Sequence, residues 1–299
     1  MDSNNETRNE TRGMFLGLIG VVIFSMTLPF TRMAVAELDP VFIALGRAVV
    51  AGVAATLLMW HMRAPRPTGK QWRGIAITAA GCVVGFPLFT SFAMRHVPAA
   101  HGAIVVGILP LATAVAAALR FGERPSAGFW AIAATGSAVV VAFAVWQGGG
   151  SLAPADLALF IAVVAAGIGY AEGGRLSQAM GGQQVISWAL IVSLPFLLPI
   201  TLWSAWQHGV SASMRAWAAF GYVSLFSMFI GFVFWYKGLA LGGIARVGQV
   251  QLLQPFMTMA AAVLILGEAF DWRNFLFAGV IVALVVLGKR MPVKRRISA

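Results

Sequence analysis

The chain has 299 residues, of which 60% are apolar and 10% are charged, and its mean hydropathy is +0.85. Ordinary soluble domains hold about 45–50% apolar and about 25% charged residues, so this composition excludes a soluble globular protein. Ten membrane-crossing runs would leave at most about 100 residues for loops and tails, which is too few for an additional globular domain. The formal net charge is +11, so the position of the basic residues must decide between a nucleic-acid partner and a membrane surface.

The apolar residues fall into runs of about twenty, each long enough to cross the ~30 Å hydrocarbon core as one helix. Four prolines, Pro40, Pro98, Pro125 and Pro154, stand at or just before helix starts, where a missing N–H costs nothing. The sequence therefore predicts an all-α membrane protein with ten transmembrane helices. We expect them at residues 14–35, 41–62, 72–93, 99–121, 127–146, 154–174, 184–206, 214–237, 245–267 and 272–289.

The charged residues predict the orientation of these helices. With a cytoplasmic amino terminus, 16 of the 21 Lys and Arg residues lie on the inner side, including Arg63, Arg66 and Lys70 in one loop. Cytoplasmic loops of membrane proteins carry such an excess, so we expect both termini in the cytoplasm. The basic residues are spread over every inner loop instead of forming one patch, which argues against a nucleic-acid partner.

The two halves of the chain repeat one motif at an offset of 145 residues. Pro110 matches Pro255, and Gly122-Glu123 matches Gly267-Glu268. We therefore expect a duplicated five-helix unit, and because five is odd the second copy enters the membrane from the opposite side. The expected organisation is a polar tail at 1–12, a first repeat at 13–146, a second repeat at 154–289 and a basic tail at 290–299.

Ten helices in two repeats, each with Pro-x11-Gly-Glu in its fourth helix, resemble the EamA branch of the drug/metabolite transporter superfamily. The resemblance implies an exporter of amino acids and other metabolites in the bacterial inner membrane. It also implies a midplane cavity formed by the first, third, fourth, sixth, eighth and ninth helices. In length and in aromatic content of these helices, the chain is most similar to the YddG-type exporters of aromatic and neutral amino acids. The first-helix signature departs from the family pattern, since Phe24-Ser25-Met26-Thr27 replaces tryptophan followed by small residues.

Several residues on these helices are candidates for the substrate site. Pro110 and Pro255 lie near the middle of their helices, where each frees a backbone carbonyl and bends the helix. Uncharged polar, aromatic and small side chains near membrane depth complete the set, although each could equally pack between helices. The predicted substrate-binding residues are Phe24, Phe86, Phe89, Gly107, Tyr170, Trp188, Trp235, Gln251 and Gln254.

Few ionisable residues lie within the predicted helices. Arg47 is either a structural anchor, which we favour, or the partner of a substrate carboxylate. Glu172 lies near the inner end of the sixth helix and is the nearest candidate for a proton-carrying group. Glu123 and Glu268 follow helix-ending glycines and suggest an architectural role, with neighbouring Arg124 and Arg273 as available partners.

The predicted function is therefore export of aromatic or neutral amino acids by alternating access, as a facilitator without obligatory proton coupling. A multidrug exporter would want an acidic residue at the midplane, and none is expected there. A channel remains an alternative. An intramembrane enzyme is disfavoured because the sequence holds no paired intramembrane Asp and no HExxH. The single Cys82 excludes a disulfide framework, and no cofactor or metal is expected. The expected partners are a small-molecule substrate and membrane lipid, and the protein is a monomer or a homodimer.

Overall fold

The structure is a computed structural model that describes residues 3–121, 124–147, 152–242, 247, 250–291 and 293–294. Gly122 and Glu123 of the repeated motif, and most of the predicted tail at 290–299, lie outside the described residues. The first repeat contains α1 Ser3–Ser25, α2 Thr27–Val35, α3 Pro40–His61, α4 Gly69–Thr78, the π-helix η1 Ala79–Gly85, α5 Phe86–Met94, α6 Ala99–Val106, α7 Leu109–Phe121 and α8 Ala127–Gln147. The second contains α9 Pro154–Met180, α10 Gly182–His208, α11 Met214–Gly221, the π-helix η2 Tyr222–Ile230, α12 Gly231–Gly242, the 3-10 helix η3 Gln251–Leu253, α14 Gln254–Ala261, the π-helix η4 Ala262–Leu266 and α15 Trp272–Arg290.

These elements join into ten apolar helical runs, which confirms the predicted all-α membrane fold. Eight runs are long and apolar enough to cross a membrane, and two shorter apolar helices cover Gln251–Leu266 and Trp272–Gly288. Two departures are small. The first helix begins at Ser3, well before the expected residue 14, and the two-residue strands β1 Arg124–Pro125 and β2 Val293–Lys294 pair antiparallel beside α8.

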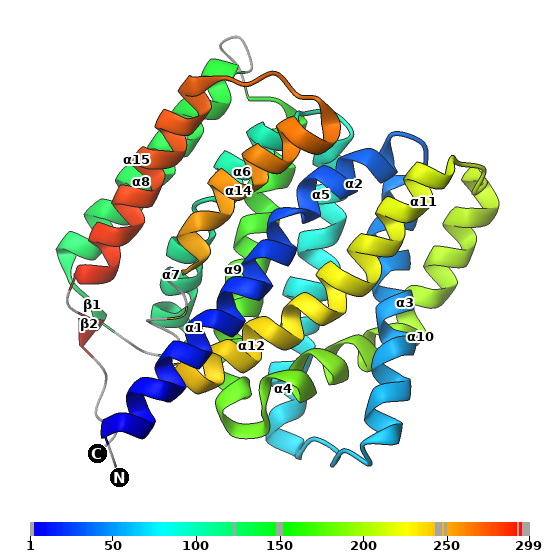
Figure 1. Cartoon of the computed structure of the whole chain (residues 1–299), viewed down its shortest axis with the longest axis horizontal. Helices are drawn as coiled ribbons and strands as arrows, with labels where there is room; N and C mark the ends of the chain where they lie inside the picture. The colour runs from blue at the N-terminus through cyan, green and yellow to red at the C-terminus, as the bar shows by residue number, and fades with distance from the viewer. Residues whose placement is uncertain are drawn as a thin grey trace.

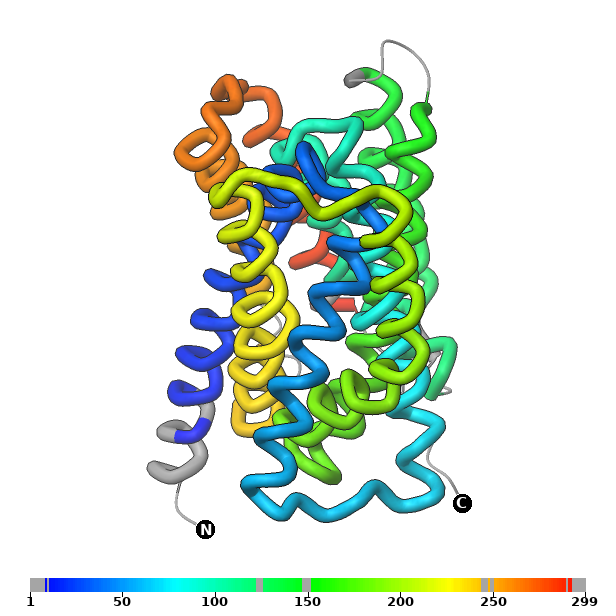
Figure 2. The backbone as a smooth tube through the Cα atoms, turned by 90° about the vertical axis from the view of Figure 1, so that its right-hand side faces the viewer, coloured from blue at the N-terminus to red at the C-terminus, as the bar shows by residue number. Residues whose placement is uncertain are grey.

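The two repeats are inverted relative to each other. In Figure 1, α1 starts at the lower end of the molecule, whereas α9, the first helix of the second repeat, starts at the upper end. We call lower the end that holds the start of α1 and the end of α15, and upper the opposite end. Figure 2 shows the long helices running between the two ends, with the α3–α4 connection at the lower end. This is the arrangement that an odd number of helices per repeat requires.

Several helices are interrupted; the interruptions of the third and fourth helices have counterparts in the second repeat, whereas α9, the counterpart of the first helix, is continuous. Adding 143 to the first residue of η1, Ala79, gives Tyr222, the first residue of η2. The first helix breaks at Met26, and the fourth breaks at Gly107 and Ile108, just before Pro110. Breaks and π-turns leave backbone groups without helical partners, and such segments are frequent at functional sites. Their positions therefore mark the middle of the bundle as the place to look for a site.

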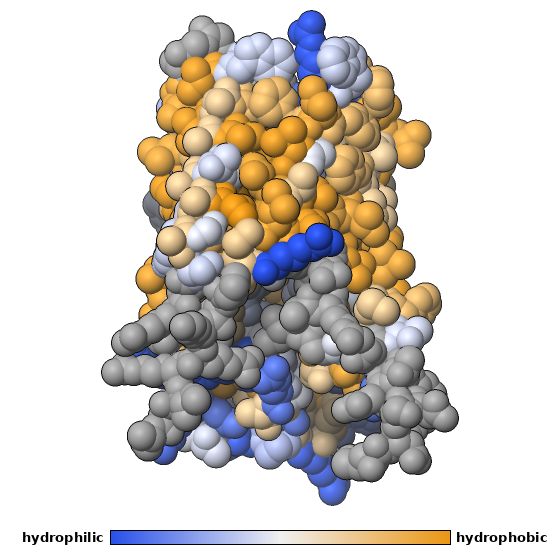
Figure 3. Space-filling model, turned by 90° about the vertical axis from the view of Figure 1, so that its left-hand side faces the viewer, coloured by the Kyte–Doolittle hydropathy of each residue, from blue (hydrophilic) through white to orange (hydrophobic). Residues whose placement is uncertain are grey.

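Close helix contacts hold the two repeats together. A Cβ on Gly13 of α1 would lie 2.5 Å from the Gly242 backbone at the end of α12, so only glycine lets these helices approach so closely. Outside the bundle, large apolar side chains face outward; Trp60 is 80% exposed and Leu264 is 84% exposed. Figure 3 shows the resulting apolar belt over the upper and middle part of one side, with hydrophilic side chains gathered toward the lower end. This surface suits a lipid environment.

Candidate functional site

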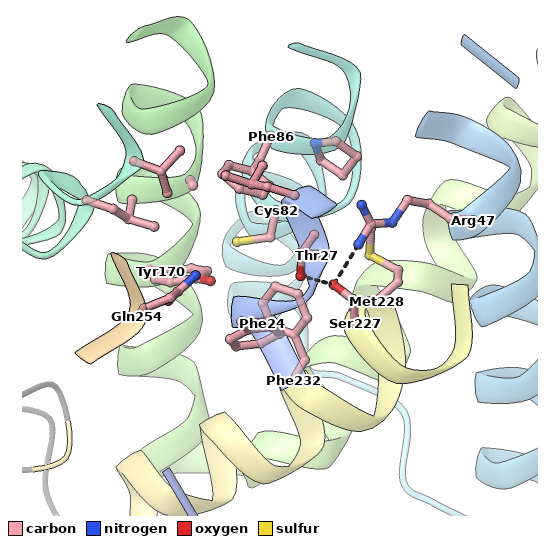
Figure 4. Close-up of a pocket in the computed structure, with 15 residues that line it drawn as sticks. Phe24, Thr27, Arg47, Cys82, Phe86, Tyr170, Ser227, Met228, Phe232 and Gln254 are labelled. Atoms are coloured by element: carbon pink, nitrogen blue, oxygen red, sulfur yellow. Dashed lines mark hydrogen bonds between the residues drawn. The ribbon is translucent and has the colours of Figure 1, made fainter. Parts of the chain in front are cut away.

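A central cavity lies where the interrupted helices of both repeats meet. Its wall includes Phe24 and Thr27 at the α1–α2 break, Cys82 on η1, and Ser227 on η2, together with side chains from α3, α5, α9, α12 and α14. Figure 4 shows Arg47 on one side of it and Tyr170 with Gln254 on the other, with aromatic rings between them. The pocket thus combines one cation with polar and aromatic groups, and no Asp or Glu is among its described lining residues.

Arg47 is the cation of this pocket. Its side chain comes from α3 and is 2% exposed, and Nη2 donates a hydrogen bond to Ser227 Oγ at 2.8 Å. Nε and Nη1 have no hydrogen-bond partner among the described residues, and no described carboxylate forms a salt bridge with the guanidinium. A buried guanidinium is costly unless an anion and hydrogen bonds compensate it. Arg47 thus lies on the pocket wall, and the choice between a structural anchor and the partner of a substrate carboxylate stays a prediction.

Arg47 is held by a short polar network that joins the two repeats. Ser227 Oγ lies 2.7 Å from Thr27 Oγ1, so η2 and the start of α2 meet at the hydroxyl that accepts from Arg47. Figure 4 draws both bonds as dashed lines. The network fixes Nη2 and leaves the other guanidinium donors without a partner in the described chain.

Aromatic rings form the opposite part of the wall. Phe24 and Phe232 meet edge to face with centroids 5.0 Å apart, and Tyr170 meets Phe232 at 5.9 Å. Trp235 lies behind this layer, 6.4 Å from Phe24 and 6.3 Å from Tyr170, and is not among the lining residues. Phe86 lines the pocket from α5. Such a surface receives an apolar or aromatic group of a ligand.

A second, smaller cavity adjoins the first and shares Leu28, Val106 and Gln254 with it. It lies where the fourth and ninth helices approach each other at their interruptions. Its wall includes five of the sequence-predicted residues: Gly107, Pro110, Gln251, Gln254 and Pro255. A Cβ on Gly107 would lie 3.1 Å from Pro255 Cγ, so glycine permits the two proline-containing segments to pack closely. The Oε1 atom of Gln254 is buried without a partner among the described residues.

Besides Trp235, two more sequence-predicted residues line neither of these cavities. Phe89 packs against the core beside the first repeat and does not line either cavity. Trp188 lines a separate cavity near the lower end of α3 and meets Trp72 edge to face at 5.7 Å. Conversely, Thr27, Ser227 and Phe232 line the central pocket although they were not predicted to bind substrate. When a helix is apolar on all sides, the periodicity of its sequence does not indicate which face points to the cavity.

At the upper end, Glu268 links the segment after η4 to the start of α6 and to α2. Its two carboxylate oxygens accept from the backbone N–H groups of Ala99 and Ala100 at 2.7 and 3.0 Å, at the start of α6. Oε1 also lies 3.3 Å from Arg32 Nε on α2. The partner of Glu268 is therefore Arg32 and not the neighbouring Arg273, which lies over the Trp146 ring instead. The site of Glu123, its counterpart in the first repeat, lies outside the described residues.

Polar side-chain pairs tie the fourth and sixth helices together near both ends. His101 Nε2 lies 2.6 Å from Asp156 Oδ1 near the upper end. Near the lower end Glu172 Oε2 accepts from Arg120 at 2.8 and 3.1 Å. The carboxylate of Glu172 is thus paired and does not line the central pocket. Among the described residues no group of three or more His, Cys, Asp or Glu side chains could hold a metal.

The central pocket is nearly closed in this conformation. It leaves about 20 Å³ for the centre of a water molecule, enough for one water. A molecule larger than water can therefore enter this pocket only if its wall moves.

Comparison with protein families decides the class of this protein. The EamA-like transporter family matches it twice, at residues 11–146 and 153–288. The chain belongs to the EamA-like transporter family. The two matches coincide with the two inverted repeats, so each repeat corresponds to one copy of the family's sequence model. This agrees with the duplication expected from Pro-x11-Gly-Glu. The protein is thus a multi-pass membrane transporter.

Similar proteins are also transporters by name. The chain is 48% identical to the "Uncharacterized transporter YdeK" of Bacillus subtilis over 262 residues, covering 88% of this chain and 91% of that protein. It is 26% identical over 289 residues to a "Probable terminal-alkyne amino-acid exporter" of Streptantibioticus cattleyicolor, covering 94% and 95%. A solved crystal structure with 16% identity superimposes with a TM-score of 0.63 over 93% of this chain and 98% of that one, which shows a shared fold.

Proposed function

We propose that this EamA-like transporter exports amino acids with neutral, apolar or aromatic side chains, and that Arg47 binds the substrate carboxylate. The observation that carries the proposal is the buried guanidinium of Arg47, with Nε and Nη1 unpartnered on the wall of the central pocket. A carboxylate supplies the charge and the paired acceptor oxygens that an arginine fork needs.

The rest of the pocket suits the other parts of an amino acid. The rings of Phe24, Phe86 and Phe232 offer an apolar surface for the side chain. The free Oε1 of Gln254 can accept from the ammonium group, and aromatic faces attract the same cation. A carrier of organic cations would instead need an acidic group at the pocket, and the described lining holds none. The name of the Streptantibioticus relative, an amino-acid exporter, supports the same substrate class.

The inverted repeats around the central pocket suggest a mechanism of transport by alternating access. Two similar halves of opposite orientation have two conformations of similar energy, one open to each side. We propose that amino acid runs down its own gradient through these states. The lining residues of the pocket include no Asp, Glu or His in the described chain, and Glu172 is paired with Arg120. We place the lower end of the molecule, with its loop residues Arg63 and Arg66, in the cytoplasm of a bacterial cell.

Binding to the purified full-length transporter tests the role of Arg47. The ligand pairs are phenylalanine with its carboxamide, and leucine with its carboxamide, so that only the carboxylate charge changes. We expect the wild type to prefer the acid by about 10- to 100-fold, the range for ~1.5–3 kcal/mol from a charged hydrogen-bonded contact. Arg47→Gln should abolish this preference, and Arg47→Lys should restore part of it.

Arg73→Gln is the matched control because Arg73 is exposed at the lower end and lies outside the central pocket. Thermal unfolding in detergent separates loss of binding from loss of folding. Equal affinity for acid and amide in the wild type would refute the proposed carboxylate site. An acid preference that survives in folded Arg47→Gln would refute the role of Arg47.

A further inference from the structure

The roomiest of the three cavities described lies away from the transport pocket, at the lower end between α3, the α3–α4 loop and α10. It encloses about 660 Å³ and is lined by nine residues. Two arginines, Arg63 and Arg66, line it together with His61. Two tryptophans, Trp60 and Trp188, form part of the wall. We propose that this cavity binds one anionic phospholipid, with the phosphate at the arginines and acyl-chain carbon against the apolar wall.

Arg63 has a left-handed backbone conformation that favours glycine. The last turn of α3 closes with Ala64 N–H donating to Met59 O and Arg63 N–H donating to Trp60 O, both at 3.1 Å. This pair of bonds is a Schellman cap, whose left-handed residue is usually glycine. Arg63 has φ 47°, and no other non-glycine among the described residues has a positive φ. Arginine is less favourable than glycine in this conformation, so the backbone alone does not explain the presence of Arg63.

The charge on this cavity is not neutralised by the protein. None of the nine described lining residues is acidic, and neither guanidinium makes a hydrogen bond or salt bridge within the described structure. Two arginines that line one cavity attract a phosphate. Both are exposed, which keeps them available to an external ligand.

The lining of the cavity also passes from the apolar runs of α3 and α10 to the polar loop after α3. The apolar run of α3 ends at His61, directly before the two arginines, whereas Met59 and Ile191 lie within apolar helical runs. Trp60 is 80% exposed, and tryptophans gather at this depth of a membrane. A lipid presents the same order of groups, with an anionic headgroup followed by hydrocarbon. A soluble phosphate would use the arginines alone.

This site is separate from the transported substrate. On α3, Arg47 precedes Met59 by twelve residues, which corresponds to about 18 Å along a helix. The two cavities share no lining residue. The lipid proposal therefore does not depend on which solute the central pocket carries.

The test uses the full-length transporter in nanodiscs of phosphatidylcholine with a small fraction of phosphatidylglycerol, followed by native mass spectrometry of the released protein. We expect the wild type to retain one phosphatidylglycerol. In the Arg63→Gln/Arg66→Gln variant, the fraction of transporter that retains a phosphatidylglycerol should be at least tenfold lower. The Lys70→Gln/Arg73→Gln variant removes the same charge from the same loop region outside the cavity, and it should retain the lipid.

Two further arms separate the explanations. Arg63→Gly removes the guanidinium and keeps the left-handed backbone. It should therefore weaken lipid retention without lowering the melting temperature. A lower melting temperature with unchanged lipid retention would indicate a structural role for Arg63 and overturn the proposal. Glycerol phosphate and inorganic phosphate should not displace the lipid, and full displacement by either would show an anion site that needs no acyl chain. Equal lipid loss in both double variants would show general surface charge and overturn the proposal.

Discussion

A guanidinium kept from water needs an anion within reach, and Arg47 has one hydrogen bond from Nη2 and two unpartnered nitrogen atoms in the described structure. Its position depends on Ser227, which accepts from Arg47 and also meets Thr27. This network joins η2 of the second repeat to the helix break of the first. At the residue scale, the hydroxyls of Ser227 and Thr27 therefore position the guanidinium of Arg47, which faces aromatic rings and the amide of Gln254 across the pocket.

Removing the hydroxyl of Ser227 tests this network. In Ser227→Ala the guanidinium loses its one described acceptor, so we expect KM for a transported amino acid to rise by about tenfold or more, given ~1.5–3 kcal/mol for a hydrogen bond to a charged group. Efflux from proteoliposomes measures it. Ser224→Ala is the control, because Ser224 is also buried on η2 and its hydroxyl donates only to Phe220 O. Equal KM values for the two variants would show that Ser227 does not position Arg47.

At the scale of the elements, the sequence predicted the ten helices and their duplication because the length of an apolar run and a spaced Pro-x11-Gly-Glu motif are local properties. It also predicted Phe24, Phe86, Tyr170 and Gln254, which the structure brings to one pocket. Their functional role stays a prediction. The misplacement of Trp188 has a physical cause: a helix apolar on all sides carries no periodic signal for the face that turns toward the cavity.

The π-helical segments could not be foreseen for a similar reason. A π-turn depends on how a helix packs against its neighbours, and the residues of η1 and η2 have no composition that sets them apart from α-helix. The partner of Glu268 was equally hidden, since Arg32 is 236 residues away in sequence. Long-range pairs of this kind require the fold.

The break in the fourth helix should be needed for transport. In Pro110→Ala the missing N–H is restored, so the segment through Gly107 and Ile108 can become continuous helix and lose its adaptable backbone. We expect a severalfold lower efflux rate with unchanged membrane content. Pro195→Ala in α10 is the control, because Pro195 is also inside a helix but lines none of the three cavities. Full activity in Pro110→Ala would assign this proline to packing alone.

The upper end should open more readily when Glu268 loses its charge. Glu268→Gln weakens the ion pair with Arg32 and the acceptors for Ala99 and Ala100. A reporter cysteine at Ala103 in a Cys82→Ala background should then react severalfold faster with a thiol reagent added to the upper side. Asp271→Asn, which removes an N-cap carboxylate at the same end, should leave the rate unchanged. Faster labelling in both variants would point to general loosening.

At the scale of the whole molecule, two inverted repeats enclose a nearly closed pocket, and their opposite directions follow from five helices each. The proposed membrane orientation rests on the distribution of the basic residues. We expect a cysteine introduced at Gly69, the exposed first residue of α4, to react only from the cytoplasmic side in cells. Labelling of that cysteine by an impermeant reagent outside intact cells would reverse the orientation, and with it the direction of export.

Counterflow in proteoliposomes tests the central claim, that this protein is a carrier of amino acids, most directly. Vesicles loaded with a high concentration of unlabelled phenylalanine are diluted into a trace of labelled phenylalanine, without any pH or voltage gradient. A carrier that alternates around one pocket should accumulate the label transiently above its external concentration, and Arg47→Gln vesicles should not. Label that only equilibrates in wild-type vesicles would indicate a channel, and no label entry for any neutral amino acid would contradict the substrate class.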